Sequence, residues 1–242
     1  MPADAPTILA TSGGIGPGTR TRWEFTALTR HAVDLSGVAG TPRVCFLATA
    51  GGDDSAYLVN FYTAAQAAGF SPSHLALFPM PNVAEPAELL LDQDVIFVGG
   101  GSVAGLLAPW RMHGVDAAMH AAWRAGVVLT GVSAGSLCWH AGGTTDSFGP
   151  RLRAVTDGLG FLPYANGVHH DSEPQRRPLF QRLIADGTLP GGYATDDGAG
   201  LLYRDTELVE ALSEEPGRYA YRVDPGGDGT ATEERLDTRL LR

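Results

Sequence analysis

The 242-residue sequence contains no lysine, and all 17 of its basic residues are arginines. This absence excludes the sites that depend on a lysine: the Walker-type phosphate loop, the Schiff-base enzyme and the Ser–Lys dyad. A nucleophilic serine in this chain would therefore need a histidine as its base.

Basic residues are also outnumbered, since 27 acidic residues bring the formal net charge to −10. This balance argues against nucleic acid or an anionic membrane surface as a partner. No apolar run approaches the length of a membrane span, and the N-terminus lacks the basic and apolar parts of a signal peptide. We expect a soluble cytoplasmic protein and leave a homodimer as an open question.

Cysteine is scarce as well, with only Cys45 and Cys138. Each lies in or beside an apolar segment, so we expect two buried thiols in a reducing compartment rather than a disulfide. The histidines lack the helical His-x-x-x-His spacing of common metal sites. The glycine-rich stretch 12–18 is interrupted by Pro17, which is incompatible with the dinucleotide fingerprint. We therefore expect neither a metal nor a cofactor.

The chain does contain a regular alternation of strand-like and helix-like segments. With 44% hydrophobic residues it can bury a full core, and we expect a single domain over residues 1–242. Near-continuous apolar strands alternating with helices predict an α/β fold, a mostly parallel sheet with helices on both faces. A glycine-rich turn at 225–229 predicts a C-terminal β-hairpin. The expected strands include 43–48, 75–78, 94–98 and 127–129, and the expected helices 25–35, 57–68, 84–91 and 116–125.

The stretch around Ser133 has the Gly-x-Ser-x-Gly pattern of a nucleophile elbow. In that turn a strand passes sharply into a helix, and the strained backbone needs small neighbours, which Gly131 and Gly135 supply. The turn would aim the Ser133 hydroxyl at the first free N–H groups of the helix. The pattern therefore predicts a catalytic serine.

An oxyanion hole needs two preorganised N–H donors. One candidate is the amide of Ala134, which follows the serine. The other comes from the glycine triplet after the strand at 94–98, with Gly101 favoured over Gly100. Both glycine-rich turns lie at carboxyl ends of expected parallel strands, where α/β proteins form their sites.

The favoured base among the seven histidines is His169 or His170, because both lie at a strand end and are followed by polar residues. The acid that orients it is left as two alternatives, Asp197 or Asp146, with Asp196 a lesser option. No histidine follows His170, so the Ser–Asp–His order of common α/β-hydrolases fits poorly, and Ser–His–Asp with Asp197 fits better.

An ordered set of segments extends through most of the chain: 98–102, 131–135, 144–146, 169–171 and 196–198. The set resembles the peptidase E (aspartyl dipeptidase) and cyanophycinase family of serine peptidases. The resemblance implies a class I glutamine-amidotransferase-like, flavodoxin-like three-layer fold, with Ser133 as nucleophile and His169 as base. It places the acid at Asp197 or Asp146. Ser102 departs from the asparagine that usually follows the glycine triplet.

The resemblance implies a hydrolase of small peptides, a dipeptidase that acts through an acyl-enzyme, with a preference for N-terminal aspartate. Arg176 and Arg177 are candidates for gripping that side chain, since arginine can hold a carboxylate through two parallel hydrogen bonds. Two alternatives stay open: a cyanophycinase-like hydrolase of an aspartate–arginine polymer, and a non-catalytic amidotransferase-like binding protein.

Overall fold

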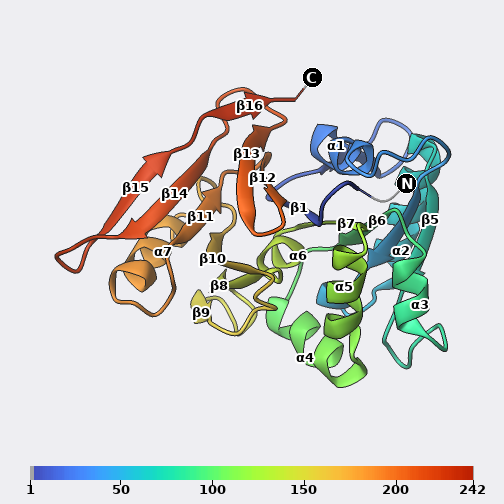
Figure 1. The fold of residues 1–242 in the computed structure, drawn as a ribbon, viewed down its shortest axis with the longest axis horizontal. Helices are drawn as coiled ribbons and strands as arrows, with labels where there is room; N and C mark the ends of the chain where they lie inside the picture. Colours follow the sequence, from blue (N-terminus) through green and yellow to red (C-terminus); the bar gives the residue numbers. More distant parts are fainter. Residues whose placement is uncertain (1–2, 242) are drawn as a thin grey trace.

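A computed structural model describes residues 3–241 of the 242-residue chain, and its strands form two larger sheets and a small hairpin (Figure 1). The first sheet has the order β16-β13-β12-β1-β7-β6-β4-β5. Its strands β5, β4, β6, β7 and β1 pair in parallel, whereas β12 is antiparallel to β1. Their bounds are β1 Thr7–Thr11, β4 Arg43–Leu47, β5 Ser71–Leu75, β6 Val95–Val98, β7 Val128–Val132, β12 Ala199–Arg204, β13 Glu207–Ser213 and β16 Thr238–Leu240.

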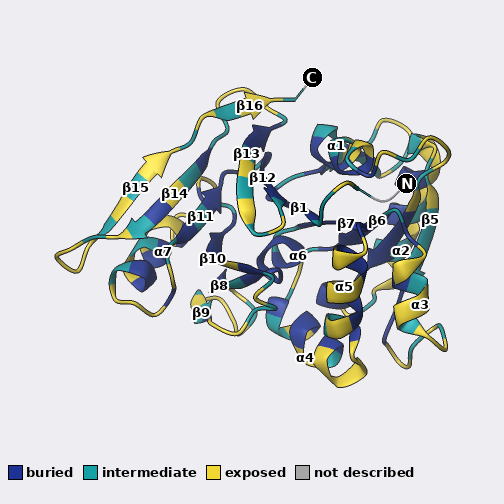
Figure 2. Ribbon diagram, in the orientation of Figure 1, coloured by how far each residue is buried: buried dark blue, intermediate teal, exposed yellow. Residues whose placement is uncertain are grey.

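Helices cover both faces of this sheet because side chains alternate along its strands. Cys45 and Ile96 face a core that also holds Trp110 and Met119 of helices α4 and α5. Phe46, one residue on from Cys45, packs in the opposite core against helix α2. The expected three-layer α/β arrangement is thus confirmed, and Figure 2 shows its central strands buried. The helices on this sheet are α1 Ala27–Asp34, α2 Ser55–Ala68, α3 Pro86–Leu91, α4 Val103–His113 and α5 Val115–Arg124.

A second, six-stranded sheet follows the short helix α6 (Ala134–Leu137) and has the order β15-β14-β11-β10-β8-β9. Helix α7 (Arg176–Ala185) packs on it through Phe180 and Ile184. The sequence interpretation did not separate this sheet from the first. Its strands are β8 His140–Thr145, β9 Arg153–Val155, β10 Leu162–Gly167, β11 Gly192–Thr195, β14 Ala220–Pro225 and β15 Ala231–Arg235.

Two expected strands differ from the structure. The strand expected at 75–78 is β5, which covers Ser71–Leu75 and pairs with β4 over its whole length. Its serines and proline concealed it, since they lower the apparent β propensity. The C-terminal hairpin is confirmed as β14 and β15, but the last strand, β16, leaves it and pairs with β13 of the first sheet.

A third, small element, the hairpin of β2 (Ile15–Pro17) and β3 (Trp23–Phe25), lies over helix α2. The stretch 12–18, which its sequence favours as a plain loop, in fact contains β2, and its Ser12 directly follows the carboxyl end of β1. Within residues 3–241, no helix combines the length and the apolar character required to cross a bilayer.

Candidate active site

Ser133 occupies the sharp turn between β7 and α6, with φ +58° and ψ −112°. A residue other than glycine rarely adopts a positive φ, and such strain is concentrated at functional sites. The flanking glycines are required by close packing on β6. A Cβ on Gly131 would lie 2.7 Å from the carbonyl oxygen of Val98, and one on Gly135 would lie 2.2 Å from it. The turn thus has the geometry that the Gly-x-Ser-x-Gly pattern predicts.

The glycine triplet after β6 lies directly beside the serine. A Cβ built on Gly100 would lie 3.4 Å from Cβ of Ser133. The Gly100 amide donates to the Tyr57 hydroxyl at 2.9 Å, so it is already engaged. The amides of Gly101 and Ala134, by contrast, have no acceptor within residues 3–241. Gly101 has φ +135°, a conformation that favours glycine.

His169 also has a positive φ, +55°, at the turn that follows β10. Its backbone amide donates to the Ser12 hydroxyl at 3.3 Å, and that hydroxyl lies 2.6 Å from the hydroxyl of Thr195. The Ser133 amide donates to the carbonyl of Thr11 at 3.1 Å. Ser133 and His169 are therefore held by consecutive residues at the end of β1, although their side chains form no direct hydrogen bond in the described chain.

Nδ1 of His169 lies 2.5 Å from Oδ1 of Asp197, and both side chains are only partly exposed. The Asp197 amide donates to Asp171 at 2.9 Å, and Asp171 in turn pairs with Arg218. Burial raises the pKa of Asp197, but hydrogen bonds from His169 and Ser172 outweigh it and leave the pKa below its ordinary value. The carboxylate is therefore ionised at neutral pH.

The two other candidate acids lie elsewhere. Asp146 lies in the loop after β8, and the Asp146 side chain makes no hydrogen bond to His169. The next residue, Ser147, accepts a hydrogen bond from the Ala104 amide. Asp196 accepts from the Tyr219 amide at 3.0 Å and from the hydroxyl of Tyr221 at 3.2 Å. Burial raises its pKa. Asp196 thus ties β14 to the loop that carries Asp197.

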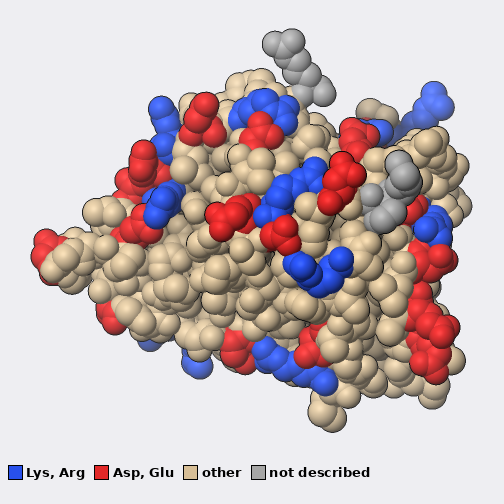
Figure 3. Space-filling view, in the orientation of Figure 1, with Lys and Arg blue, Asp and Glu red and all other residues tan. Residues whose placement is uncertain are grey.

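Both arginines that are candidates for binding the substrate already interact with other residues of the chain. Arg176 is buried and donates to Glu173 at 2.8 Å and to the carbonyl of Thr144 at 2.9 Å. Arg177 pairs with Glu233 and lies over the ring of Tyr221. Arginines that adjoin carboxylates recur across the face shown in Figure 3. A role for Arg176 and Arg177 in substrate binding stays a prediction.

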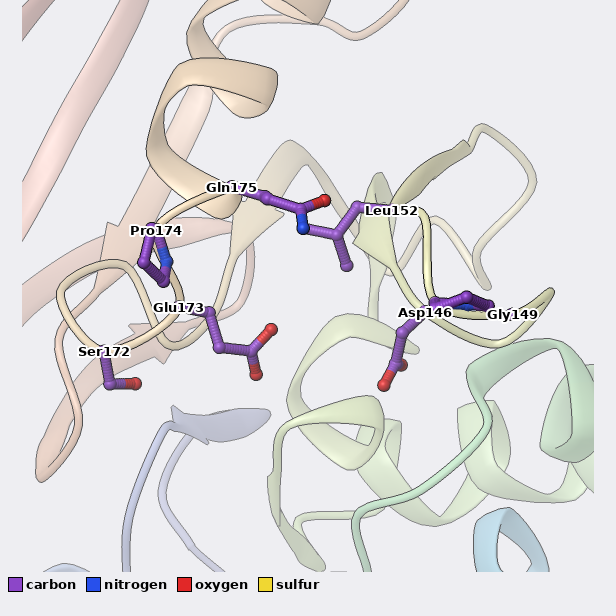
Figure 4. Close-up of a pocket in the computed structure, with 8 residues that line it drawn as sticks. Asp146, Gly149, Leu152, Ser172, Glu173, Pro174 and Gln175 are labelled. Carbon is purple, nitrogen blue, oxygen red and sulfur yellow. The ribbon is translucent and has the colours of Figure 1, made fainter.

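Three cavities adjoin these residues. The first, of about 460 Å³, is lined by Asp146, Ser172, Glu173 and Gln175, and Figure 4 shows the carboxylates of Asp146 and Glu173 extending into it from two loops. The second, of about 370 Å³, is lined by Val132, His169 and Asp197. The third, of about 380 Å³, borders Gly100 on the side of the β2–β3 hairpin.

Several residues of the site were not singled out from the sequence. Ser12, Thr195 and Tyr57 reach it through contacts between segments far apart in the chain, and no local pattern marks them. Ser12 lies in the glycine-rich stretch after β1, and its place at a strand end is the one signal that could have drawn attention to it. In the part of the chain that the structure describes, no three His, Cys, Asp or Glu residues are grouped to hold a metal ion.

Comparison with known proteins decides the family. The profile of Peptidase family S51 matches residues 8–211. The chain belongs to this family and is a peptidase. It is 43% identical over 182 residues to the "Uncharacterized peptidase YgaJ" of Bacillus subtilis (strain 168), which covers 75% of this chain and 78% of that protein. It is 36% identical over 75 residues to peptidase E of Citrobacter koseri, covering 31% of this chain and 33% of that relative.

Solved structures support the fold. A peptidase from an acI-B1 Actinobacterium superimposes with a TM-score of 0.66 at 17% identity, covering 97% of this S51 peptidase and 95% of that chain. A candidate peptidase E from Listeria monocytogenes EGD-e superimposes with a TM-score of 0.63 at 17% identity, covering 86% and 98%. The expected flavodoxin-like α/β fold is therefore confirmed.

Proposed function

We propose that this S51 peptidase is a dipeptidase of the peptidase E type that hydrolyses amide bonds of small peptides through Ser133, His169 and Asp197. The observation that carries the proposal is the 2.5 Å contact between His169 Nδ1 and Asp197 Oδ1. It leaves Nε2 as the ring nitrogen that can accept a proton, and it supplies the charge that stabilises the resulting imidazolium.

In the proposed mechanism, Nε2 of His169 removes the proton of the Ser133 hydroxyl, and Oγ attacks the carbonyl carbon of the substrate. The oxyanion that forms accepts hydrogen bonds from the amides of Gly101 and Ala134. His169 then protonates the leaving amine as the C–N bond breaks. A water molecule attacks the acyl-enzyme, gives its proton to His169 and releases the acid, and the proton returns to Ser133.

Ser133 and His169 must approach each other for the first step. Catalytic hydrogen bonds are often long in ligand-free structures and shorten when substrate binds. Both residues are anchored at the end of β1, through Thr11 and Ser12, which keeps their backbones in neighbouring places. The preference for N-terminal aspartate belongs to this proposal as a prediction.

A second candidate function is hydrolysis of an aspartate–arginine polymer, and the cavity in Figure 4 favours it. Asp146 presents a carboxylate to this cavity, and so does Glu173, which also pairs with Arg176; this acidic lining suits a guanidinium of a substrate. Ser172, in the wall of the same cavity, lowers the pKa of Asp197, so the cavity adjoins the proposed triad.

A panel of Asp-Ala, Ala-Ala and β-Asp-Arg dipeptides tests both functions on the wild type and on Ser133→Ala. We expect the wild type to cleave at least one dipeptide and the variant to lose about 10³-fold or more of kcat. Ser71→Ala, at an exposed position on the edge strand β5, is the matched control and should keep full activity. Faster cleavage of β-Asp-Arg than of Asp-Ala would favour the second candidate. Equal cleavage by wild type and Ser133→Ala would reject the mechanism, and binding of peptides without cleavage would indicate a non-catalytic protein.

A further inference from the structure

The three cavities described above differ in charge. The cavity in Figure 4 is lined by Asp146 and by Glu173, whose carboxylate pairs with Arg176. The cavity beside His169 contains Asp197, Glu214 and Glu215 together with Arg218, whose guanidinium pairs with Asp171 and Glu215. We call the third cavity the hairpin cavity. Its arginine, Arg22, forms no ion pair with the described residues.

The hairpin cavity has a volume of about 380 Å³ and lies between the β2–β3 hairpin and helix α2. The hairpin contributes Arg22 and Trp23, and the helix contributes Tyr57 and Asn60. The rings of Trp23 and Tyr57 meet edge to face with their centroids 4.9 Å apart. They form an apolar wall that is held in place by direct contact.

This cavity shares a wall with the reaction centre. Gly100 lines it, and the Gly100 amide donates to the hydroxyl of Tyr57 at 2.9 Å. A Cβ on Gly100 would lie 3.4 Å from Cβ of Ser133, so a single backbone segment separates the cavity from the serine. A dipeptide at Ser133, about 7 Å long when extended, would have to pass over Gly100 to reach it.

Arg22 differs from the arginines near the other two cavities. In residues 3–241 its guanidinium makes no ion pair, whereas Arg176, Arg177 and Arg218 each pair with a carboxylate. Asp54 also lines the hairpin cavity, but it is the N-cap of α2 and accepts from the Tyr57 amide at 3.0 Å. Arg22 is exposed and brings to the cavity a positive charge that forms no ion pair within residues 3–241.

We propose that the hairpin cavity binds a carboxylate of the peptide substrate, with Arg22 as the residue that grips it. Arginine holds a carboxylate through two parallel N–H···O bonds, and the walls of Trp23 and Tyr57 pack against the apolar part of the same residue. The carboxylate comes from the C-terminus of the peptide or from an acidic side chain. The assignment rests on the proposed function for the placement of the peptide at Ser133, but binding can be measured without turnover.

The test measures binding by calorimetry in the Ser133→Ala background, where peptides are not consumed. The probes are Ala-Ala, Ala-Ala-amide, Asp-Ala and Asp-Ala-amide, each titrated into Ser133→Ala and Ser133→Ala/Arg22→Gln. We expect Arg22→Gln to weaken binding of a carboxylate-bearing probe by about 10- to 100-fold, the usual range for a hydrogen bond to a charged group. If Arg22→Gln weakens binding of Ala-Ala but not of Ala-Ala-amide, the group bound by Arg22 is the C-terminal carboxylate. If it weakens binding of Asp-Ala-amide, that group is the acidic side chain.

Arg20→Gln is the matched control, because Arg20 is exposed in the same hairpin and does not line the cavity. It should leave all four affinities unchanged, and circular dichroism melts should agree among the variants. Equal affinities with and without Arg22 would overturn the assignment, as would failure of all four probes to bind. Arg22-dependent binding without cleavage by the wild type would reject the proposed dipeptidase function and leave the carboxylate site standing.

Discussion

The carboxylate of Asp197 lies 2.5 Å from Nδ1 of His169, although 28 positions separate the two residues in the chain. Strands β10 and β11 pair in parallel, so the segments that follow them, with His169 and Asp197, emerge at the same edge of the second sheet. The turn that carries Ser133 follows β7 of the first sheet. The proposed catalytic site therefore lies where the two sheets meet, and Ser12, at the end of β1, links them by accepting a hydrogen bond from the His169 amide.

Asp197→Asn should lower kcat by about 10³- to 10⁴-fold, because an amide in place of the carboxylate favours the wrong imidazole tautomer and cannot stabilise the imidazolium. Asp146→Asn is the matched change at the rival acid, which makes no bond to His169. It should leave kcat within a few-fold of the wild type. Steady-state kinetics on the best dipeptide of the panel decides between them, and a greater loss in Asp146→Asn would transfer the role of the acid.

Much of this arrangement follows from local sequence. The Gly-x-Ser-x-Gly pattern predicts the turn at Ser133, because only glycine tolerates carbonyl oxygens as close as those beside Gly131 and Gly135. Apolar runs predict β4, β6 and β7, since buried parallel strands need no polar face. The position of His169 and His170 at a strand end favoured them over the other histidines, and the family resemblance selected His169.

The features that local sequence could not predict are those that depend on which distant segments contact one another in the fold. The choice between Asp197 and Asp146 required the pairing of β10 with β11. The ion pairs of Arg176 and Arg177 were also hidden. Glu173 is only three residues from Arg176, but Glu233 reaches Arg177 from the C-terminal hairpin. A pattern of arginines alone does not distinguish a free cation from a paired one.

Gly101→Ala should destabilise the protein, whereas Gly100→Ala should not. A Cβ on Gly101 would lie 2.4 Å from the carbonyl oxygen of Ala50, at φ +135°. We expect a loss of about 1–3 kcal/mol or more in the free energy of unfolding, from backbone strain alone. A Cβ on Gly100 makes its nearest contact at 3.4 Å, which is ordinary packing. Urea unfolding of both variants checks this, and equal stability would contradict the clash.

His140 should make the protein less stable in mild acid. Burial lowers the pKa of this fully buried imidazole to about 4. Between pH 6.5 and pH 4 the unfolded chain binds a proton that the folded protein does not, so stability falls as pH decreases through that window. From pH 7 to pH 5 the loss from this group is about 2 kcal/mol.

The measurement compares urea unfolding at pH 7 and pH 5 for the wild type, His140→Gln and the exposed His113→Gln. His140→Gln should lose less stability on acidification than the wild type, whatever its stability at pH 7. His113→Gln should follow the wild type. An unchanged pH dependence in His140→Gln would show that this imidazole is not the source.

Glu233→Ala should impair both stability and turnover, although Glu233 lies beyond the region that matches the family profile. Its carboxylate accepts from His170 at 2.9 Å and from Gln181 at 3.0 Å, and it pairs with Arg177. His170 is buried and directly follows His169, so the C-terminal hairpin holds the proposed base in its strained conformation. Removal leaves the buried His170 without this acceptor, which should lower the free energy of unfolding by about 1–3 kcal/mol.

A displaced His169 should appear in kcat rather than in KM, because Glu233 touches the loop of the proposed base and lines none of the three cavities. We expect kcat to fall by roughly 10- to 100-fold, the scale of a catalytic group misplaced by a remote change. Glu234→Ala is the matched control, since Glu234 is the next residue of β15 and is exposed. It should keep the kcat and the melting temperature of the wild type. A Glu233→Ala variant that melts early but retains full kcat would limit the hairpin to a role in stability, because the base would then be held in place without it.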